Sequence, residues 1–225
     1  MTSKLKVDGY LNFSNVSKDD QRKKLLHAFV KVCKFYAPND FKKKIISWES
    51  QYLHDSLITL RKKNPIIFSA IYDSMLNSYA LSQFIVSSRF DTLAQKMLKV
   101  NLNELYKHGM MLRMDCPNDN RNTYGWHQDS AYDKLSSSGD NGCVFWAPLI
   151  NTNKENGSII LMPKSQYEKN ADADIGKRNS KLKTKKLSSK QILVDTKLIK
   201  KYEEKQMNVK VGETVSFYSG LLHKS

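Results

Sequence analysis

The sequence contains no long apolar run, and this absence restricts where the protein can reside. The longest apolar stretches, at residues 66–68 and 158–162, are far shorter than the roughly 20 residues of a membrane-spanning helix. The first residues, from Met1 to Lys6, also lack the apolar core of a secretory signal. We therefore expect no membrane partner, and a protein that stays in the cytoplasm.

Cysteine is scarce as well. The three cysteines, Cys33, Cys116 and Cys143, are odd in number, lie far apart and form no Cys-x-x-Cys pair. This pattern argues against a disulfide framework and against a structural zinc site.

Acidic residues are few relative to basic ones, at 22 against 37, so the formal net charge is +15. Lysine supplies 31 of the basic residues and is abundant together with Asn, Ser and Ile. An AT-rich genome produces this composition without selection for charge, so the charge is a weak indication of a nucleic-acid partner, which we do not expect. With 225 residues, 40% of them hydrophobic, the chain suits one domain with a buried core.

The first hundred residues show helical periodicity. Apolar residues recur at helical spacing in four segments, which predict helices from about residue 18 to Pro38, from Asp40 to Pro65, from Ile67 to Tyr79, and from Asp91 to Leu98. We interpret these stripes as packing surfaces. His27 and His54 lie among them and are predicted to be surface or half-buried polar residues, not ligands.

After residue 100 the sequence changes to short apolar runs separated by Gly, Pro, Asn and Asp. Five runs have the length and composition of strands: Met110–Met114, Val144–Ile150, Ser158–Met162, Met207–Val211 and Thr214–Tyr218. Such strands behind a helical layer predict an α+β fold with a sandwich or jelly roll. Residues 164–190, rich in Lys, Ser and Asn, are predicted to form a long loop.

One short pattern suggests metal binding. His127 and Asp129 are two residues apart, so on a strand their side chains would point to the same face. Alone this spacing is weak, because with five histidines chance places an Asp two residues after some His with a probability of about one third. His223 is the candidate second imidazole, which would complete the two-His-one-carboxylate set that holds Fe(II) and leaves positions open.

Four segments around these residues resemble the phytanoyl-CoA dioxygenase family of Fe(II)- and 2-oxoglutarate-dependent oxygenases. They are Trp126 to Ser130, Val144 to Leu149, Glu155 to Gln166, and Val211 to Phe217 followed by Leu222 to Ser225. Their order and separations agree with the family. The resemblance implies a double-stranded β-helix, a cupin-like jelly roll, formed by residues 101–225. Residues 1–100 would be helices packed on the outside of this jelly roll, so that residues 1–225 form a single oxygenase domain.

The resemblance also implies roles for residues. His127, Asp129 and His223 would ligate iron, with 2-oxoglutarate as co-substrate and dioxygen as the oxidant for hydroxylation of an unactivated carbon. Trp146 and Ser225 match family positions beside the co-substrate.

Gln128 is also near 2-oxoglutarate in relatives, although on a regular strand it would point away from the metal.

In halogenating relatives a small residue replaces the carboxylate ligand. Because Asp129 is present, we expect hydroxylation, desaturation or epimerisation, and no chlorination.

The chain departs from the family pattern at two places. Pro163-Lys164-Ser165-Gln166 stands where relatives commonly have Pro-Gly-Ser-His, which should not affect metal binding. More seriously, the arginine that normally pairs with the far carboxylate of 2-oxoglutarate would lie about ten residues beyond His223, and the sequence stops at Ser225. We expect a truncated sequence; otherwise Arg113 or Arg121 takes that role, or co-substrate binding is lost.

Two other functions use the same residues. A zinc hydrolase could hold a water with His127, Asp129 and His223, although no helical His-Glu motif supplies a general base. A non-catalytic jelly-roll binding module is the other alternative. The substrate would be a small or carrier-bound metabolite, and the lysines of residues 164–190 would either attract an anionic one or reflect composition alone.

Overall fold

The computed structural model describes residues 2–107, 109–119, 124–132, 141–168, 194 and 196–225. Its helices are α1 (Thr2–Asp8), α2 (Asp19–Tyr36), α3 (Gln51–Lys63), α4 (Pro65–Leu76), α5 (Tyr79–Ser87), α6 (Phe90–Leu98) and α7 (Thr196–Ile199), with short 3-10 helices at Leu102–Glu104 and Asp129–Ala131. Its strands are β1 (Tyr10–Phe13), β2 (Cys143–Trp146), β3 (Ile160–Leu161), β4 (Lys205–Gln206), β5 (Thr214–Tyr218) and β6 (His223–Lys224). None of the described helices combines the length and the apolarity needed to cross a membrane.

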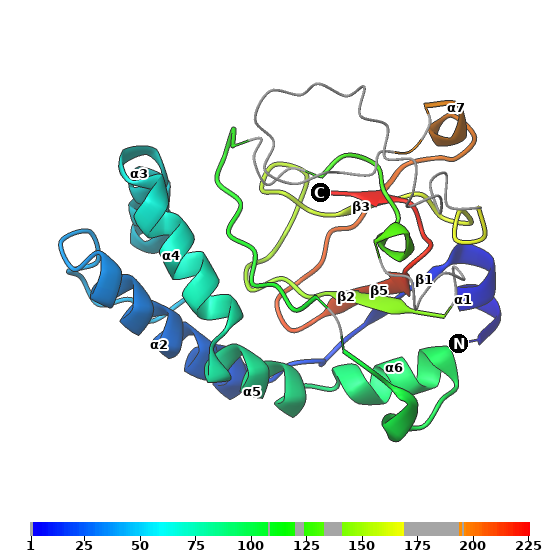
Figure 1. Ribbon diagram of the computed structural model, residues 1–225, viewed down its shortest axis with the longest axis horizontal. Coiled ribbons are helices and arrows are strands. Elements are labelled where there is room, and N and C mark those ends of the chain that lie inside the picture. Colours follow the sequence, from blue (N-terminus) through cyan, green and yellow to red (C-terminus); the bar gives the residue numbers. More distant parts are fainter. Residues whose placement is uncertain (1, 108, 120–123, 133–140, 169–193, 195) are drawn as a thin grey trace.

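The strands form two antiparallel three-stranded sheets, in the orders β1-β5-β2 and β4-β3-β6. Helices α2 to α5 lie to one side of them (Figure 1). The two sheets share one buried apolar cluster, to which β5 contributes Val215 and Phe217 and β3 contributes Leu161. The observed architecture is thus a mixed helix and sheet fold, as predicted.

Side chains alternate across the first sheet as a two-residue period requires. On β2, Val144 and Trp146 pack into the cluster between the sheets. Cys143 and Phe145 face the other way, toward a second cluster that includes Met97 of α6. Leu5 of α1 belongs to the same second cluster, so α1 and α6 both pack on the outer face of this sheet.

Strand β1 was not predicted, because residues 1–100 were expected to be helical. Tyr10 to Phe13 pair with Thr214 to Phe217 at the edge of the first sheet. Gly9 makes the turn into this strand with a φ of +78°, and a Cβ there would lie 2.5 Å from Gln166 Oε1. The helical layer thus contributes one strand to the sheet.

The predicted helix limits were wrong at two places. The helix expected from Asp40 begins only at Gln51, because the Ser50 side chain accepts a hydrogen bond from Leu53 N and caps it there. The helix expected from Ile67 to Tyr79 ends at Leu76, and Ser78 caps the separate helix α5.

Two of the five predicted strands are not strands. Residues 110–114 form no ladder, because Leu112 and Met114 pack against the apolar cluster of the helices instead. Residues 207–211 are irregular although Met207 and Val209 are buried between the sheets. The predicted strands at 144–150 and 158–162 are shorter than expected, whereas Thr214–Tyr218 is confirmed.

Candidate metal centre

Three side chains from two chain segments converge at one side of the second sheet. His223 lies in β6, His127 forms a bridge with it, and Asp129 begins the 3-10 helix that follows His127. The Asp129 Oδ1 atom lies 3.4 Å from His127 Nε2 and 3.7 Å from His223 Nε2. All three ligand atoms lie within 4.8 Å of one another, a grouping that occurs once among the described residues.

Backbone pairing joins the two histidine segments, and this pairing contains a β-bulge. His127 and His223 exchange both backbone hydrogen bonds, at 3.0 and 3.1 Å. The next exchanging pair is Tyr124 with Ser225, at 3.1 and 3.3 Å, so two residues of one segment lie opposite the single residue Lys224 of the other. Such a bulge bends the strand and redirects the side chains beside it.

The backbone also sets which nitrogen of each imidazole can bind a metal. His127 Nδ1 lies 2.7 Å from the Gly125 carbonyl, and His223 Nδ1 lies 2.9 Å from the Leu221 carbonyl. Because a carbonyl oxygen only accepts, both Nδ1 atoms must carry the proton. Each Nε2 then presents a lone pair on the side of Asp129, which is the arrangement of a metal-ligating histidine.

Burial keeps His223 in its neutral, ligating form. His127 and His223 are 7% and 5% exposed, whereas the Asp129 side chain is 39% exposed. Burial lowers the pKa of His223 to about 4, against the Asp129 charge, which acts to raise it. The ring of Phe217 lies 4.7 Å from that of His223. The site is therefore closed behind the histidines and more open at the carboxylate.

This donor set fits Fe(II). Two imidazole nitrogens and one carboxylate oxygen on one face leave positions for further ligands, which is the arrangement of non-heme Fe(II) oxygenases. The same three donors with a bound water would also suit zinc.

The structure brings Arg113 and Ser225 together beside the site. Arg113 Nη1 donates a hydrogen bond to Ser225 Oγ, and Nη2 lies 3.1 Å from both oxygens of Asp115. The guanidinium also lies over the Tyr124 ring, 5.4 Å from its centroid. Its charge reaches His223, since it acts to lower the pKa of that imidazole. Arg113 is thus a cation whose charge acts on His223 and which pairs with the Asp115 carboxylate and the Ser225 hydroxyl.

The structure also shows the surroundings of two other predicted site residues, Trp146 and Gln128. Trp146 is half-buried and packs into the cluster between the sheets. Gln128 is 2% exposed, and its amide donates to the carbonyls of Gly220 and Glu168. Arg121 and most of the lysine-rich segment lie outside the described residues, so an anionic substrate stays a prediction.

The aromatic side chains that surround His127 were not predicted from the sequence. The rings of Tyr124 and Tyr132 lie 5.5 and 6.2 Å from the His127 ring. Lys224 Nζ lies 4.5 Å from the ring of Trp126. Tyr124, Trp126 and Tyr132 are near His127 in the sequence, and Lys224 directly follows His223. This proximity in sequence was the signal that could have predicted these contacts.

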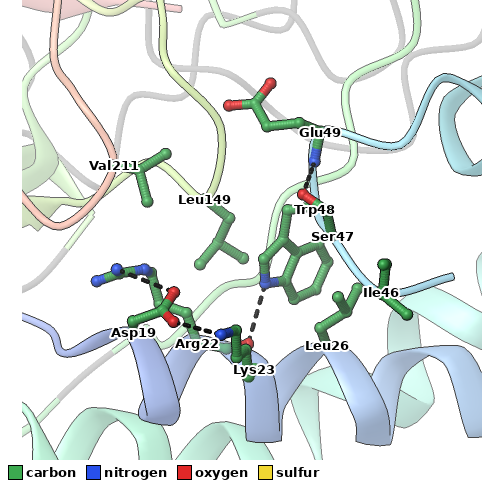
Figure 2. Close-up of a pocket in the computed structure, with 10 residues that line it drawn as sticks. All are labelled: Asp19, Arg22, Lys23, Leu26, Ile46, Ser47, Trp48, Glu49, Leu149 and Val211. Atoms are coloured by element: carbon green, nitrogen blue, oxygen red, sulfur yellow. Dashed lines mark hydrogen bonds and ion pairs between the residues drawn. The ribbon is translucent and has the colours of Figure 1, made fainter.

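A cavity of about 110 Å³ lies elsewhere, between α2 and residues 46–49 (Figure 2). Its charged residues are paired: Asp19 lies 2.6 Å from Lys23 and 3.5 Å from Arg22, and Glu49 accepts from Asn151 N. The cavity shares no lining residue with the candidate metal centre, so we assign it no part in the site.

Comparison with solved structures supports this fold. The epimerase SnoN in complex with Fe3+, alpha ketoglutarate and nogalamycin RO aligns with a TM-score of 0.55 and 12% identity, over 99% of this chain and 74% of that chain. The SnoN structure described as a non-heme alpha ketoglutarate dependent epimerase from nogalamycin biosynthesis aligns with a TM-score of 0.51 and 11% identity, over the same shares. At these identities the likeness concerns the fold alone.

A search of curated protein sequences finds no match to this chain. A family model is more sensitive, because it represents many related sequences at once. The model described as phytanoyl-CoA dioxygenase matches residues 5–225, which include the helical layer, both sheets and the three converging side chains. With nearly its whole length matched, the chain belongs to the phytanoyl-CoA dioxygenase family.

Proposed function

We propose that this protein is an Fe(II)- and 2-oxoglutarate-dependent dioxygenase, with residues 1–225 as a single oxygenase domain. One observation carries the proposal: two tautomer-fixed imidazoles and a carboxylate converge on one point in a member of this family. The two sheets around one apolar cluster would be parts of the family's double-stranded β-helix.

The residues of the site would have two roles. His127, Asp129 and His223 would hold the metal, and burial of both histidines would exclude water behind it. Arg113 and Ser225 would bind and orient the far carboxylate of 2-oxoglutarate, since a guanidinium and a hydroxyl together offer several donors to a carboxylate. When bound, iron with 2-oxoglutarate and dioxygen supplies the oxidant that removes hydrogen from an unactivated carbon.

The full chain should convert 2-oxoglutarate to succinate. We expect succinate release that requires Fe(II) and dioxygen and that stops when Zn(II) replaces Fe(II), because zinc has no redox chemistry. The measurement is succinate released from 2-oxoglutarate, with and without each component. Ester hydrolysis supported by Zn(II) would favour the zinc hydrolase instead. Metal and 2-oxoglutarate binding without any succinate would favour a binding module.

The product of a small or carrier-bound substrate should carry new oxygen, a double bond or an inverted centre, and no halogen. A carboxylate oxygen of Asp129 lies within 4.8 Å of a ring nitrogen of each histidine, so all three groups can bind one metal ion. The carboxylate would then fill the position on the metal that chloride needs. Mass spectrometry of products formed in excess chloride tests this expectation. A chlorinated product from the unmodified protein would refute the role of Asp129 as a ligand.

A further inference from the structure

We propose that Gln128 is a positioning residue that holds the two ligand-bearing segments together, and that it makes no contact with the co-substrate. The inference rests on the proposed function, because it assigns a role toward the same metal centre. It replaces the expectation, drawn from relatives, that this side chain lies beside 2-oxoglutarate.

The direction of the Gln128 side chain is the first step. The residue lies between His127 and Asp129 on extended backbone, with φ −119° and ψ 131°. Successive side chains on extended backbone point to opposite faces. Gln128 is accordingly 2% exposed, and its Nε2 lies 2.6 Å from the Gly220 carbonyl and 3.2 Å from the Glu168 carbonyl. Both amide hydrogens have backbone acceptors, and on this extended backbone the Gln128 side chain points away from the face that the His127 side chain occupies.

One of the two acceptors, the Gly220 carbonyl, connects Gln128 to the segment of the second histidine. Gly220 directly precedes Leu221, whose carbonyl holds His223 Nδ1 at 2.9 Å. Beside this contact, Ser130 N donates to the Ser219 carbonyl at 3.0 Å. A backbone bond and the Gln128 side chain therefore join the segment of Asp129 to the turn that orients His223.

The backbone of Gln128 acts on Asp129 directly. The Gln128 carbonyl accepts from Ala131 N at 3.1 Å, which closes the short turn that Asp129 begins. One residue thus connects to Asp129 through its main chain and to the His223 segment through its side chain. Loss of the amide should alter the separation of these two ligands.

The test compares Gln128→Met with Gln166→Met in the full chain. Methionine keeps the length of glutamine and removes both amide donors. Gln166 is a matched control because it is 1% exposed and its Nε2 also donates to two carbonyls, those of Lys6 at 2.8 Å and Val7 at 3.4 Å, in the N-terminal helix. Co(II) serves as the probe, because its visible spectrum reports the geometry of its ligands.

We expect Gln128→Met to weaken Co(II) binding about 10- to 100-fold, the usual effect of losing a partner outside the ligand set, and to change the Co(II) spectrum. The succinate-forming kcat should fall while the KM for 2-oxoglutarate stays within about twofold, the pattern of a group that does not bind this co-substrate. Gln166→Met should keep the metal affinity and spectrum of the wild type.

Three results would overturn the inference. One is a wild-type Co(II) affinity and spectrum in Gln128→Met. Another is a raised KM for 2-oxoglutarate with unchanged metal binding, which would place the amide on the co-substrate. The third is an equal loss of Co(II) affinity in Gln166→Met, which would reveal general destabilisation. If Gln128→Met does not fold, Gln128→Leu provides the same comparison, since leucine also lacks the amide donors and has a similar volume. A wild-type protein that binds no Co(II) would instead overturn the proposed function itself.

Discussion

Fe(II) affinity should fall at least about 100-fold in either His127→Ala or His223→Ala, and succinate release should stop. Each substitution removes one of three donors, and loss of a mere supporting partner already costs about 10- to 100-fold in metal affinity. Alanine also cannot replace the lone pair that the Nδ1 hydrogen bond directs toward Asp129. Equilibrium titration with Fe(II) without oxygen, followed by metal analysis, measures this effect.

His27→Ala is the matched control for these two variants. His27 lies exposed on α2 and is absent from the converging group, so its loss should leave metal binding unchanged. Undiminished iron binding in both His127→Ala and His223→Ala would refute the assignment of the ligands.

The Kd for 2-oxoglutarate should rise about 10- to 150-fold in Arg113→Met, because a hydrogen bond to a charged group contributes about 1.5–3 kcal/mol. Arg113→Lys should recover only part of this affinity, since lysine keeps the charge but lacks the planar pair of donors. The measurement is a 2-oxoglutarate titration of the Fe(II)-loaded protein without oxygen.

Arg89→Met controls for the loss of one positive charge, because Arg89 is exposed at the start of α6. Metal affinity should stay unchanged in both variants. If Arg113→Met binds 2-oxoglutarate as tightly as the wild type, the cation for the far carboxylate lies elsewhere, and Arg113 with Ser225 has a structural role only.

The sequence predicted the elements that depend on local signals. Thr214–Tyr218 alternates and is buried, and it forms the central strand of its sheet. Residues 110–114 have the same local character, but their neighbours are helices far away in sequence, so no local pattern could reveal that they form no ladder. Strand β1 is short and pairs with a partner about 200 residues later, which local periodicity also does not show.

The candidate site was predicted in composition but not in geometry. Family resemblance singled out His127, Asp129 and His223, and the structure brings them together. The bulge opposite Lys224 depends on the register between two segments far apart in sequence, and so does the contact between Arg113 and Ser225. Which residue of one segment pairs with which residue of the other is decided by the three-dimensional fold. The residue types in the two segments do not predict this pairing.

One spectrum tests the central claim most directly. Fe(II) chelated by a 2-oxo acid absorbs visible light by charge transfer, and neither component does so alone. Without oxygen, addition of Fe(II) and 2-oxoglutarate to the full chain should produce this absorption at one equivalent of iron, and His223→Ala should not produce it. No absorption from the wild-type protein at saturating Fe(II) and 2-oxoglutarate would contradict the proposal that His127, Asp129 and His223 hold iron for a 2-oxoglutarate-dependent oxygenase.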